Sequence, residues 1–289
     1  CHSRLACAQY VRQLDGEGWF RMRAQDEAVL AERRERIEAR LDPSWQVEMA
    51  EPMLAGTNLR YEMAARVPAI PCGGIGLMHE LVRTLKLAES IDEHVHVFKK
   101  HFPYHESDHV LNLAYNVLAG GTRLEDLERL RTNEGYLDTL GCRRIPDPTT
   151  AGDFCRRFSA ADVHTLIDII NSVRPRVWAR QPTTFFDLAR IDMDGTLVAT
   201  DAECKAGIDI AYNGVWGYHP LVVSLANTGE VLSVLNRPGN RPSHEGAAAY
   251  IDRAIALCRG AGFQRMRLRG DTDFSQTQYL DGWDEQRDV

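Results

Sequence analysis

The hydrophobic pattern of this chain changes its period near Pro182, and that change limits the folds it can adopt. Before Pro182, apolar residues recur every three or four positions within short segments, which indicates amphipathic helices. After it, residues 185–200 alternate between apolar and polar side chains, which indicates a half-buried strand. We therefore expect a helical part followed by a part that contains a sheet, in a protein of the α/β class.

Residues 182–289 are predicted to form one sheet with a helix inserted in its strand order. After the first strand, residues 206–212 alternate again, and residues 220–236 form two strands around a turn at 227–230. A helix is expected over 243–262, with Ser243 as its N-cap and Gly260 and Gly262 at its end. Residues 266–271 then form a strand with Asp271 at its end. Several antiparallel strands, one helix and a final strand predict a mixed sheet.

Residues 73–178 are predicted to form short, capped helices in a bundle, an arrangement compatible with a helix-turn-helix. The predicted N-caps are Ser107, Thr122, Thr150 and Ser159, and the last three are followed three positions later by an acid, as in a capping box. Over 107–121, the expected buried stripe consists of Val110, Ala114, Val117 and Leu118. Residues 1–56 form a separate segment dominated by a charged, solvated helix.

Composition excludes several classes of protein. With 289 residues, 44% of them hydrophobic, the chain is long enough for two domains and can bury real cores. The seven cysteines are widely spaced and form no C-x-x-C pair, which argues against a disulfide framework or zinc knuckle and for reduced thiols in the cytosol. No apolar run reaches transmembrane length, and no signal peptide is visible. The formal net charge of −7 does not indicate a nucleic-acid binder, although a local basic face would suffice.

The segment 191–198, IDMDGTLV, carries the chemistry of the chain and allows two interpretations. In a dehalogenase-type phosphatase, Asp192 would be the nucleophile and Asp194 the acid/base. That class also needs a lysine to balance the phosphate charge, and no lysine follows Lys205. It would alternate strands and helices after its first strand, whereas strands follow one another here. A strand that carries two aspartates is also how a two-metal nuclease or transposase begins its active site, so the motif alone is a weak signal.

Six segments taken together resemble the insertion-sequence DDE transposases grouped as transposase DDE domain group 1. They are HFPYHESDHVLNLAYNVLAGGTRLEDLERLR, IPDPTTAGDFCRRF, IDMDGTLV, GVWGYHPLVVSLANTGEVL, NRPGNRPSHEGAA and LRGDTDFSQT, and they follow the order of that family. The resemblance implies a helical DNA-binding region over 57–181 and an RNase H-like catalytic domain over 182–289.

The resemblance also implies the activity, partners and cofactor. The chain would bind double-stranded DNA, both the terminal inverted repeats of its element and the target, and would cleave and transfer DNA strands. Mg²⁺ would be the cofactor, with Mn²⁺ as a substitute. A homodimer on DNA, no membrane partner, and a bacterial cytoplasmic location at the nucleoid when bound to DNA are the further expectations.

By position, the resemblance assigns Asp194 and Asp271 as the two catalytic and metal-binding acids. Two Mg²⁺ ions about 4 Å apart need carboxylates on both sides, because Mg²⁺ prefers oxygen ligands. Asp192, Asp273 and His219 are expected to support this pair, and Asp192 and Asp273 are the alternatives to Asp194 and Asp271 as the ligands.

The third catalytic acid of the family is a Glu in a helix further along. The chain ends at Val289 before such a helix, so an incomplete catalytic domain is expected. Glu230 and Glu245 lie between the two catalytic aspartates and therefore have the wrong order for that role.

Two groups of arginines are candidate DNA contacts. Arg237 and Arg241 lie with His244 near the predicted start of a helix, where backbone N–H groups favour a phosphate. The second group, in the most basic stretch of the chain, consists of Arg143, Arg144, Arg156 and Arg157. A capped surface loop and ordinary solvated arginines are the alternative interpretations.

Five histidines fall between His94 and His109, near acidic residues. Pro103 interrupts any single helix that would align them. Ordinary surface or capping roles are therefore expected for them, rather than a metal site.

Overall fold

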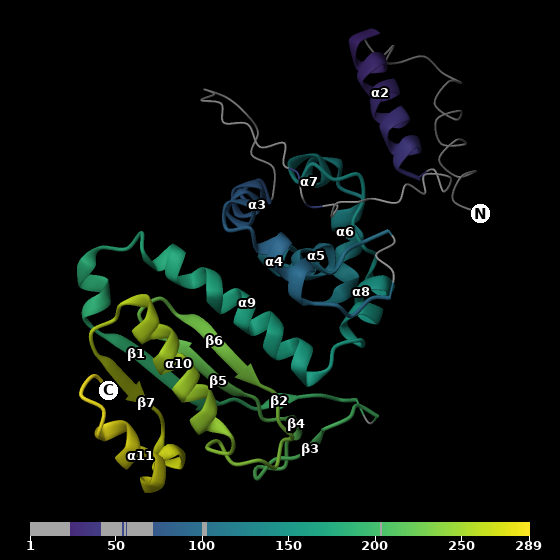
Figure 1. Cartoon of the computed structure of the whole chain (residues 1–289). Helices are drawn as coiled ribbons and strands as arrows, with labels where there is room; N and C mark the ends of the chain where they lie inside the picture. The colour runs from purple at the N-terminus through teal and green to yellow at the C-terminus, as the bar shows by residue number, and fades with distance from the viewer. Residues whose placement is uncertain (1–23, 42–53, 55, 57–71, 100–102, 203) are drawn as a thin grey trace.

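The chain folds into a helical region followed by a mixed sheet (Figure 1). The computed structural model describes residues 24–41, 54, 56, 72–99, 103–202 and 204–289. The predicted change of period is confirmed, because α-helices precede residue 179 and the first strand begins at Ala189. The expected charged helix is α2 (Ala24–Leu41), on which Arg36 pairs with Glu32 at 3.1 Å. The rest of that predicted segment, apart from Leu54 and Gly56, lies outside the described residues.

The helical region packs around two apolar clusters. Its elements are α3 (Ile75–Thr84), α4 (Leu87–His94), α5 (Glu106–Leu118), η2 (Leu124–Asp126), α6 (Leu127–Arg131), α7 (Glu134–Thr139), α8 (Pro148–Cys155) and α9 (Ala160–Trp178). The larger cluster includes Leu111, Leu127 and Leu140, and the smaller joins α4 to α9 through Ile91 and Ile169. Because α9 also carries Trp178 into the core of the sheet, it packs against both parts of the chain.

The N-caps of these helices agree only in part with the sequence. Ser159 caps α9 in a capping box, as predicted. Helix α5 begins after His105 rather than Ser107, and α8 begins after Asp147 rather than Thr150. The predicted residues lie within the first turn in both cases, so the helices were identified correctly and their starts were not.

Helix α5 buries a different face from the predicted stripe, and that face carries polar residues beside Leu111 and Tyr115. Val117 and Leu118 are 69% and 56% exposed, whereas Asn112 and Asn116 are 1% and 4% exposed. The Asn112 amide donates to the Pro146 carbonyl at 3.2 Å, and this bond offsets the cost of burying it. The predicted stripe was wrong because these tertiary hydrogen bonds, which periodicity does not reveal, determine the face that is buried.

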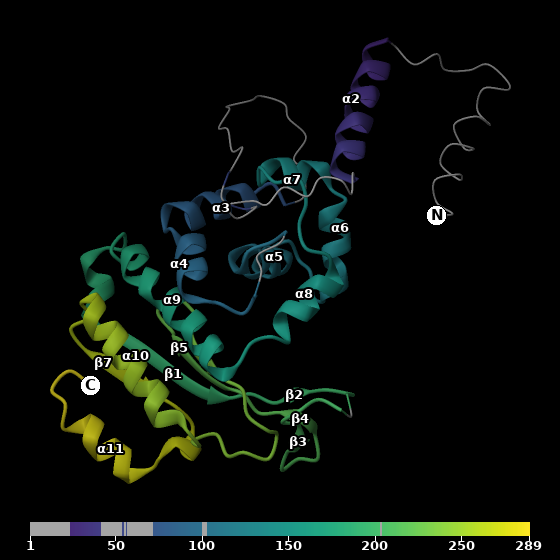
Figure 2. The same ribbon diagram turned by 45° about the vertical axis from the view of Figure 1, so that its right-hand side comes forward.

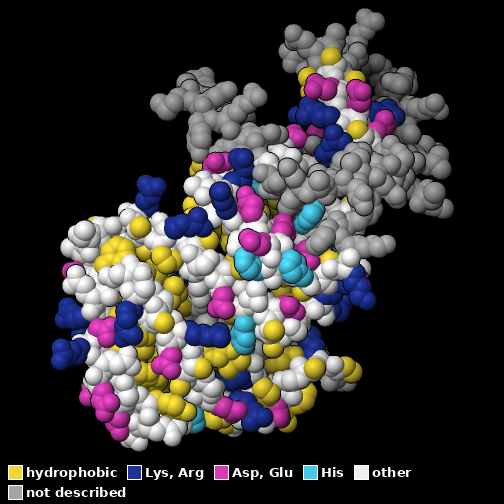
Figure 3. Space-filling view, viewed as in Figure 1, with side chains coloured by type: hydrophobic (Ala, Val, Ile, Leu, Met, Phe, Trp, Pro, Cys, Tyr) yellow, Lys and Arg dark blue, Asp and Glu magenta, His cyan; other side chains and the backbone are white. Residues whose placement is uncertain are grey.

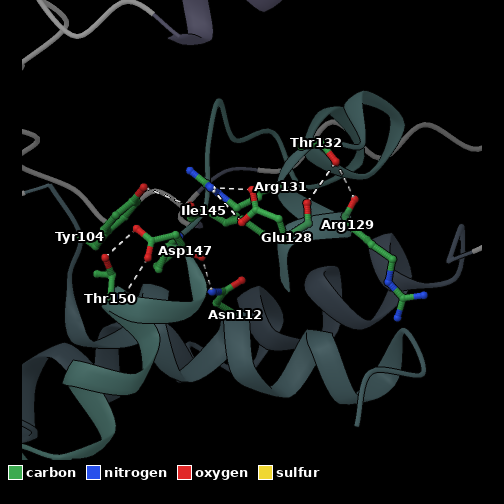
Figure 4. Close-up of polar contacts among 10 residues, drawn as sticks. Tyr104, Asn112, Glu128, Arg129, Arg131, Thr132, Ile145, Asp147 and Thr150 are labelled. Atoms are coloured by element: carbon green, nitrogen blue, oxygen red, sulfur yellow. Dashed lines mark hydrogen bonds and ion pairs between the residues drawn. The ribbon is translucent and has the colours of Figure 1, made fainter. Parts of the chain in front are cut away.

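The loop at 141–147, which carries two of the candidate DNA-binding arginines, is held by neighbouring helices (Figure 4). The hydroxyl of Tyr104 donates to the Ile145 carbonyl at 3.2 Å. Asp147 accepts from the backbone N–H and the hydroxyl of Thr150 at 2.9 and 2.7 Å, which caps α8. The second half of the loop is therefore fixed to its surroundings.

The main sheet has the strand order β6-β5-β1-β7. After η3 (Thr183–Asp187) its strands are β1 (Ala189–Gly195), β5 (Leu221–Leu225), β6 (Glu230–Leu235) and β7 (Met266–Arg269), with α10 (Ala247–Ala261) before β7. β1 is antiparallel to β5 and parallel to β7, and β5 is antiparallel to β6. The predicted mixed sheet is confirmed, and its order is compatible with an RNase H-like fold.

Within the described residues, helices cover one face of the main sheet near β1 and leave the other open. Helices α9 and α10 lie side by side over the sheet in both ribbon views (Figures 1 and 2). Ile191 and Met193 are buried in the core with α10, whereas Asp192 and Asp194 point to the opposite face. The predicted alternation along β1 is therefore confirmed, and it places the acids on the open face.

A second sheet, of order β2-β4-β3, projects from the end of β1 (Figure 2). Its strands are β2 (Val198–Ala199), β3 (Asp209–Ile210) and β4 (Trp216–Tyr218), and Tyr218 forms a bridge to Pro238. A Cβ on Gly217 would lie 2.1 Å from the Val198 carbonyl oxygen, so only glycine fits there.

After β7 come η4 (Thr272–Phe274) and α11 (Thr277–Asp284). No helix within the described ranges is long and apolar enough to cross a membrane.

Glu230→Gln is expected to lower the free energy of unfolding by about 2 kcal/mol. Trp178 donates to the Glu230 carboxylate at 2.8 Å, and so does Arg174, which is only 13% exposed. Burial raises the pKa of Glu230, but the hydrogen bonds from Trp178 and Arg174 outweigh burial, and the pKa lies below its usual value. This stabilisation is therefore present above the pKa of the unfolded chain and is lost as the pH falls through the folded-state pKa.

Urea unfolding at about pH 7 and about pH 4 measures this contribution. Glu128→Gln, which removes the partner of Arg131 in an exposed pair, is the control and should cost less than about 0.5 kcal/mol. Equal free energies of unfolding for Glu230→Gln and the unmodified chain at neutral pH would contradict the prediction.

Candidate active site

Asp194 and Asp271 lie at the same end of two neighbouring strands. β1 and β7 are parallel and are paired up to Arg269. A Cβ on Gly270 would lie 2.9 Å from Met193 Cγ, so the two chains remain adjacent one residue further on. Asp194 and Asp271 are the next residues of the two chains, and both are exposed. Two carboxylates placed in this way are suited to a shared metal site, and their catalytic role stays a prediction.

Asp192 has a partner of its own. Arg269 Nε and Nη2 donate to Asp192 Oδ1 and Oδ2, both at 2.6 Å, in a bidentate pair. The hydrogen bonds and charge of Asp192 raise the pKa of Arg269. Because both oxygens of Asp192 are bonded to a guanidinium, this carboxylate has less to offer a metal ion. The pairing favours Asp194 over Asp192 as the first ligand.

Asp273 connects Asp271 to the loop before α10. Its Oδ2 accepts from the Ser243 N–H at 2.7 Å, and its own N–H donates to Asp271 Oδ1 at 3.0 Å. The bond from Ser243 is the main cause that holds the pKa of Asp273 below its usual value. Ser243 was predicted to cap α10, but that helix begins after Gly246. The prediction was wrong because residues 243–246 form turns, and Gly246, with φ +74°, precedes the first residue of the helix.

His219 packs against Gly195, the residue that follows Asp194. It is 7% exposed, and its Nδ1 lies 2.7 Å from the Arg241 carbonyl oxygen. Because a carbonyl only accepts, Nδ1 carries the proton and Nε2 is an acceptor in the neutral ring. A Cβ on Gly195 would lie 2.5 Å from His219 Nε2 and 2.9 Å from Ser243 Oγ. The end of β1 therefore approaches His219 and Ser243 so closely that only glycine fits at position 195.

Arg237 is buried rather than exposed. It is 5% exposed, and its guanidinium donates to the backbone carbonyls of His219, Pro242, Ser243 and Glu245. A guanidinium held in this way does not reach a DNA phosphate, so the fold gives Arg237 a different task from the one predicted. Arg241 is exposed and pairs with Glu245 at 3.4 Å, and it stays a candidate phosphate contact.

The donor set fits Mg²⁺ better than a metal held by protein ligands alone. The described part of the chain contains no group of three or more His, Cys, Asp or Glu side chains that could hold a metal ion. Mg²⁺ is often bound by one or two carboxylates, with waters and substrate phosphates completing its shell. Asp194 and Asp271, exposed and on adjacent strand ends, match that requirement.

The histidines of the helical region have structural surroundings instead. His109 stacks on Phe154 at 4.5 Å, and burial lowers its pKa to about 4. His94 bonds to the Ser90 carbonyl one turn earlier in its own helix at 2.9 Å. These two histidines therefore take part in packing and hydrogen bonding, and His101 lies outside the described residues.

A family model connects this geometry to known proteins. The model described as transposase DDE domain group 1 matches residues 71–289, about three quarters of the chain. The chain belongs to that family. No curated protein matches the sequence at a significant level. The resemblance found in the six segments is thus confirmed, and the protein is a DDE transposase from a mobile element.

Family membership decides between the two interpretations of IDMDGTLV. A DDE transposase is an enzyme of DNA cleavage and transposition, and its partner is DNA. No finding favours the dehalogenase-type phosphatase, since β1, β5 and β6 form a meander rather than alternating with helices. Metal binding by the aspartates of the transposase stays a prediction.

The candidate DNA-binding arginines of the transposase have different surroundings. Arg143 is exposed, and Arg156 pairs with Asp153 at 2.6 Å. Arg144 and Arg157 lie over aromatic rings at 5.6 and 5.3 Å from the ring centres. On the face in Figure 3, Lys and Arg side chains are scattered among acidic ones rather than gathered in one patch. DNA binding by this region stays a prediction.

Three residues that shape the site were not identified from the sequence: Gly195, Ser243 as a donor to Asp273, and Arg269. A signal existed only for Arg269, because parallel pairing of the first and last strands would have placed it near Asp192. No local pattern shows that Gly195 touches His219, since that contact joins segments that are distant in the chain.

Proposed function

We propose that this transposase cleaves DNA at the ends of its mobile element and joins the freed ends to target DNA, using Mg²⁺ held by Asp194 and Asp271. The observation that carries the proposal is that the two exposed aspartates follow neighbouring parallel strands at the same end. Family membership supplies DNA as the class of substrate. Mn²⁺ accepts similar oxygen ligands and is expected to substitute.

The acids of the site have different proposed roles. Bound Mg²⁺ would activate the attacking oxygen and offset the charge on the leaving 3′-oxygen of the scissile phosphate. Asp194 and Asp271 bind and space the ions. The Asp273 N–H orients the Asp271 carboxylate, and the pair with Arg269 keeps Asp192 in a supporting position. Glu230 is bonded to Trp178 and Arg174, so it is not proposed as a further catalytic acid.

We assign most contacts with double-stranded DNA at the element ends to the helical region, over 57–181, and the chemistry to 182–289. The exposed Arg143 and the ring-supported Arg144 and Arg157 are suited to backbone phosphates, because a guanidinium forms bidentate bonds with them. A homodimer would hold two element ends together with the target.

Cleavage of a duplex that carries an end of the element tests the proposed function. The purified transposase is incubated with this DNA and Mg²⁺, Mn²⁺ or EDTA. Metal-dependent nicks at the element end that leave a 3′-hydroxyl support the proposal. Nicks that persist in EDTA, or that fall equally on unrelated DNA, contradict it.

Replacing Arg143 or Arg157 by Ala is expected to weaken DNA binding and to reduce its salt dependence. Each lost phosphate contact should lower the slope of log affinity against log salt by about one. Fluorescence anisotropy at several salt concentrations measures the slope. Arg253→Ala is the control, because Arg253 is exposed on α10 and lies over the Tyr250 ring. Unchanged slopes for both variants would move the DNA contacts away from the helical region.

A further inference from the structure

Arg237 is a buried cation whose hydrogen bonds all go to the backbone. Its Nε donates to the His219 carbonyl at 3.0 Å, and its Nη1 donates to the carbonyls of Pro242, Ser243 and Glu245 at 3.0, 2.9 and 2.7 Å. Among the described residues it forms no ion pair, and its Nη2 is buried without a hydrogen-bond partner. Burying a charge without an ion pair costs free energy, so the buried position of Arg237 needs an explanation.

The loop that Arg237 holds touches both acid-bearing strand ends. On the β7 side, the Ser243 N–H donates to Asp273, and the Asp273 N–H donates to Asp271. On the β1 side, the Ser243 hydroxyl lies against Gly195, next to Asp194. This short loop therefore adds a connection between the two strand ends, beside the strand pairing and the Asp192–Arg269 pair.

His219 reaches the same loop from the other direction. The backbone N–H of His219 donates to the Arg237 carbonyl at 2.8 Å, and the backbone carbonyl of His219 accepts from Arg237 Nε. Its ring also bonds to the Arg241 carbonyl and packs on Gly195. Arg237 thus joins the segment before β5, the end of β6 and the loop before α10 into one rigid unit.

We propose that Arg237 is a positioning residue of the metal site, which holds the loop at 242–245 so that Asp271 is fixed relative to Asp194. The inference rests on the proposed function, because it concerns the same two aspartates. Arg237 touches neither acid, and it acts through Ser243, Asp273 and Gly195. Residues that orient metal ligands in this indirect way commonly change metal affinity by about 10- to 100-fold when they are replaced.

Arg237→Lys is the informative substitution. It keeps the positive charge, but an ammonium is a single point and cannot donate to the His219 carbonyl and to the loop carbonyls at once. Arg174→Lys is the matched control. Arg174 is also a largely buried arginine, bonded to Asn171, Glu230 and the Val231 carbonyl, and it lies at the end of the β5–β6 hairpin away from the acids.

Mn²⁺ binding to the purified transposase, followed by electron paramagnetic resonance without DNA, tests the inference. Arg237→Lys should weaken binding about tenfold, while Arg174→Lys leaves it within about twofold even if both variants melt earlier. Raising the Mn²⁺ concentration should also restore DNA cleavage by Arg237→Lys. The carboxylates are misplaced but still present, so a higher metal concentration fills the weakened site by mass action. Unchanged Mn²⁺ affinity in a folded Arg237→Lys variant overturns the inference.

The remaining outcomes are also decisive. If Arg237→Lys does not fold, Asp273→Ala breaks the same connection with Arg237 intact, and a tenfold loss of Mn²⁺ affinity is again expected. An unchanged affinity in that variant overturns the inference. If the unmodified transposase binds no Mn²⁺, or binds it equally without Asp194 and Asp271, the proposed function itself fails. Failure of Arg237→Lys alone leaves the proposed function intact.

Discussion

Asp194→Asn and Asp271→Asn are each expected to reduce DNA cleavage by about 1,000-fold while leaving the fold and DNA binding intact. An amide presents one neutral oxygen in place of two charged ones, and Mg²⁺ depends on charged oxygen ligands. Both side chains are exposed, so stability should change little. Gel assays of nicking at the element end, together with thermal melts, measure the two effects separately.

Asp192→Asn and Asp281→Asn make this test specific. Asp281 is an exposed acid on α11 and should leave cleavage unchanged. Asp192 should lose less than Asp194, because both of its oxygens already bond to Arg269. Equal losses at 192 and 194 would show that the two carboxylates share the metal, and a larger loss at 192 would reverse the assignment.

The sheet could be predicted because its strands have local signals. Alternation along 189–195 identified both the buried face of β1 and the face that carries Asp192 and Asp194. The turn at 227–230 marked the β5–β6 hairpin, in which Gly229 has φ +73°. Gly262, with φ +102°, ends α10 as expected. In each case the signal, a side-chain period or a glycine at a turn, lies within a few neighbouring residues.

The contacts that hold the site could not be predicted, because they join segments distant in the chain. Asn112 is buried on α5 because its amide bonds to the Pro146 carbonyl, which follows α7 in the chain. The periodicity of α5 does not encode this contact. Arg237 looked like a DNA contact because arginine beside a helix start commonly binds phosphate, yet the carbonyls of its own loop enclose it. Local patterns located the acids, and tertiary hydrogen bonds determined their surroundings.

Gly195→Ala is expected to reduce cleavage by about 100-fold, although it adds only one methyl group. That methyl would lie 2.5 Å from His219 Nε2 and 2.9 Å from Ser243 Oγ, both too close for a real contact. His219 is 7% exposed and is bonded through its backbone and its ring, so it has little room to retreat. The end of β1 must shift instead, and Asp194 is the adjacent residue. A displacement of about 1 Å at a reacting group can cost about this much in rate.

Gly260→Ala is the control for this last prediction. Gly260 lies within α10 with nothing within 4 Å of an added Cβ, so alanine should stabilise the helix by about 0.5–1 kcal/mol and leave cleavage unchanged. Cleavage rates and thermal melts of the two variants separate a local displacement from general loss of fold. If Gly195→Ala cleaves as fast as the unmodified transposase, then His219 and Ser243 yield to the methyl group and the position of Asp194 does not depend on them. If it loses activity while keeping its melting temperature, the close packing of His219 and Ser243 on Gly195 is what holds the first acid in place.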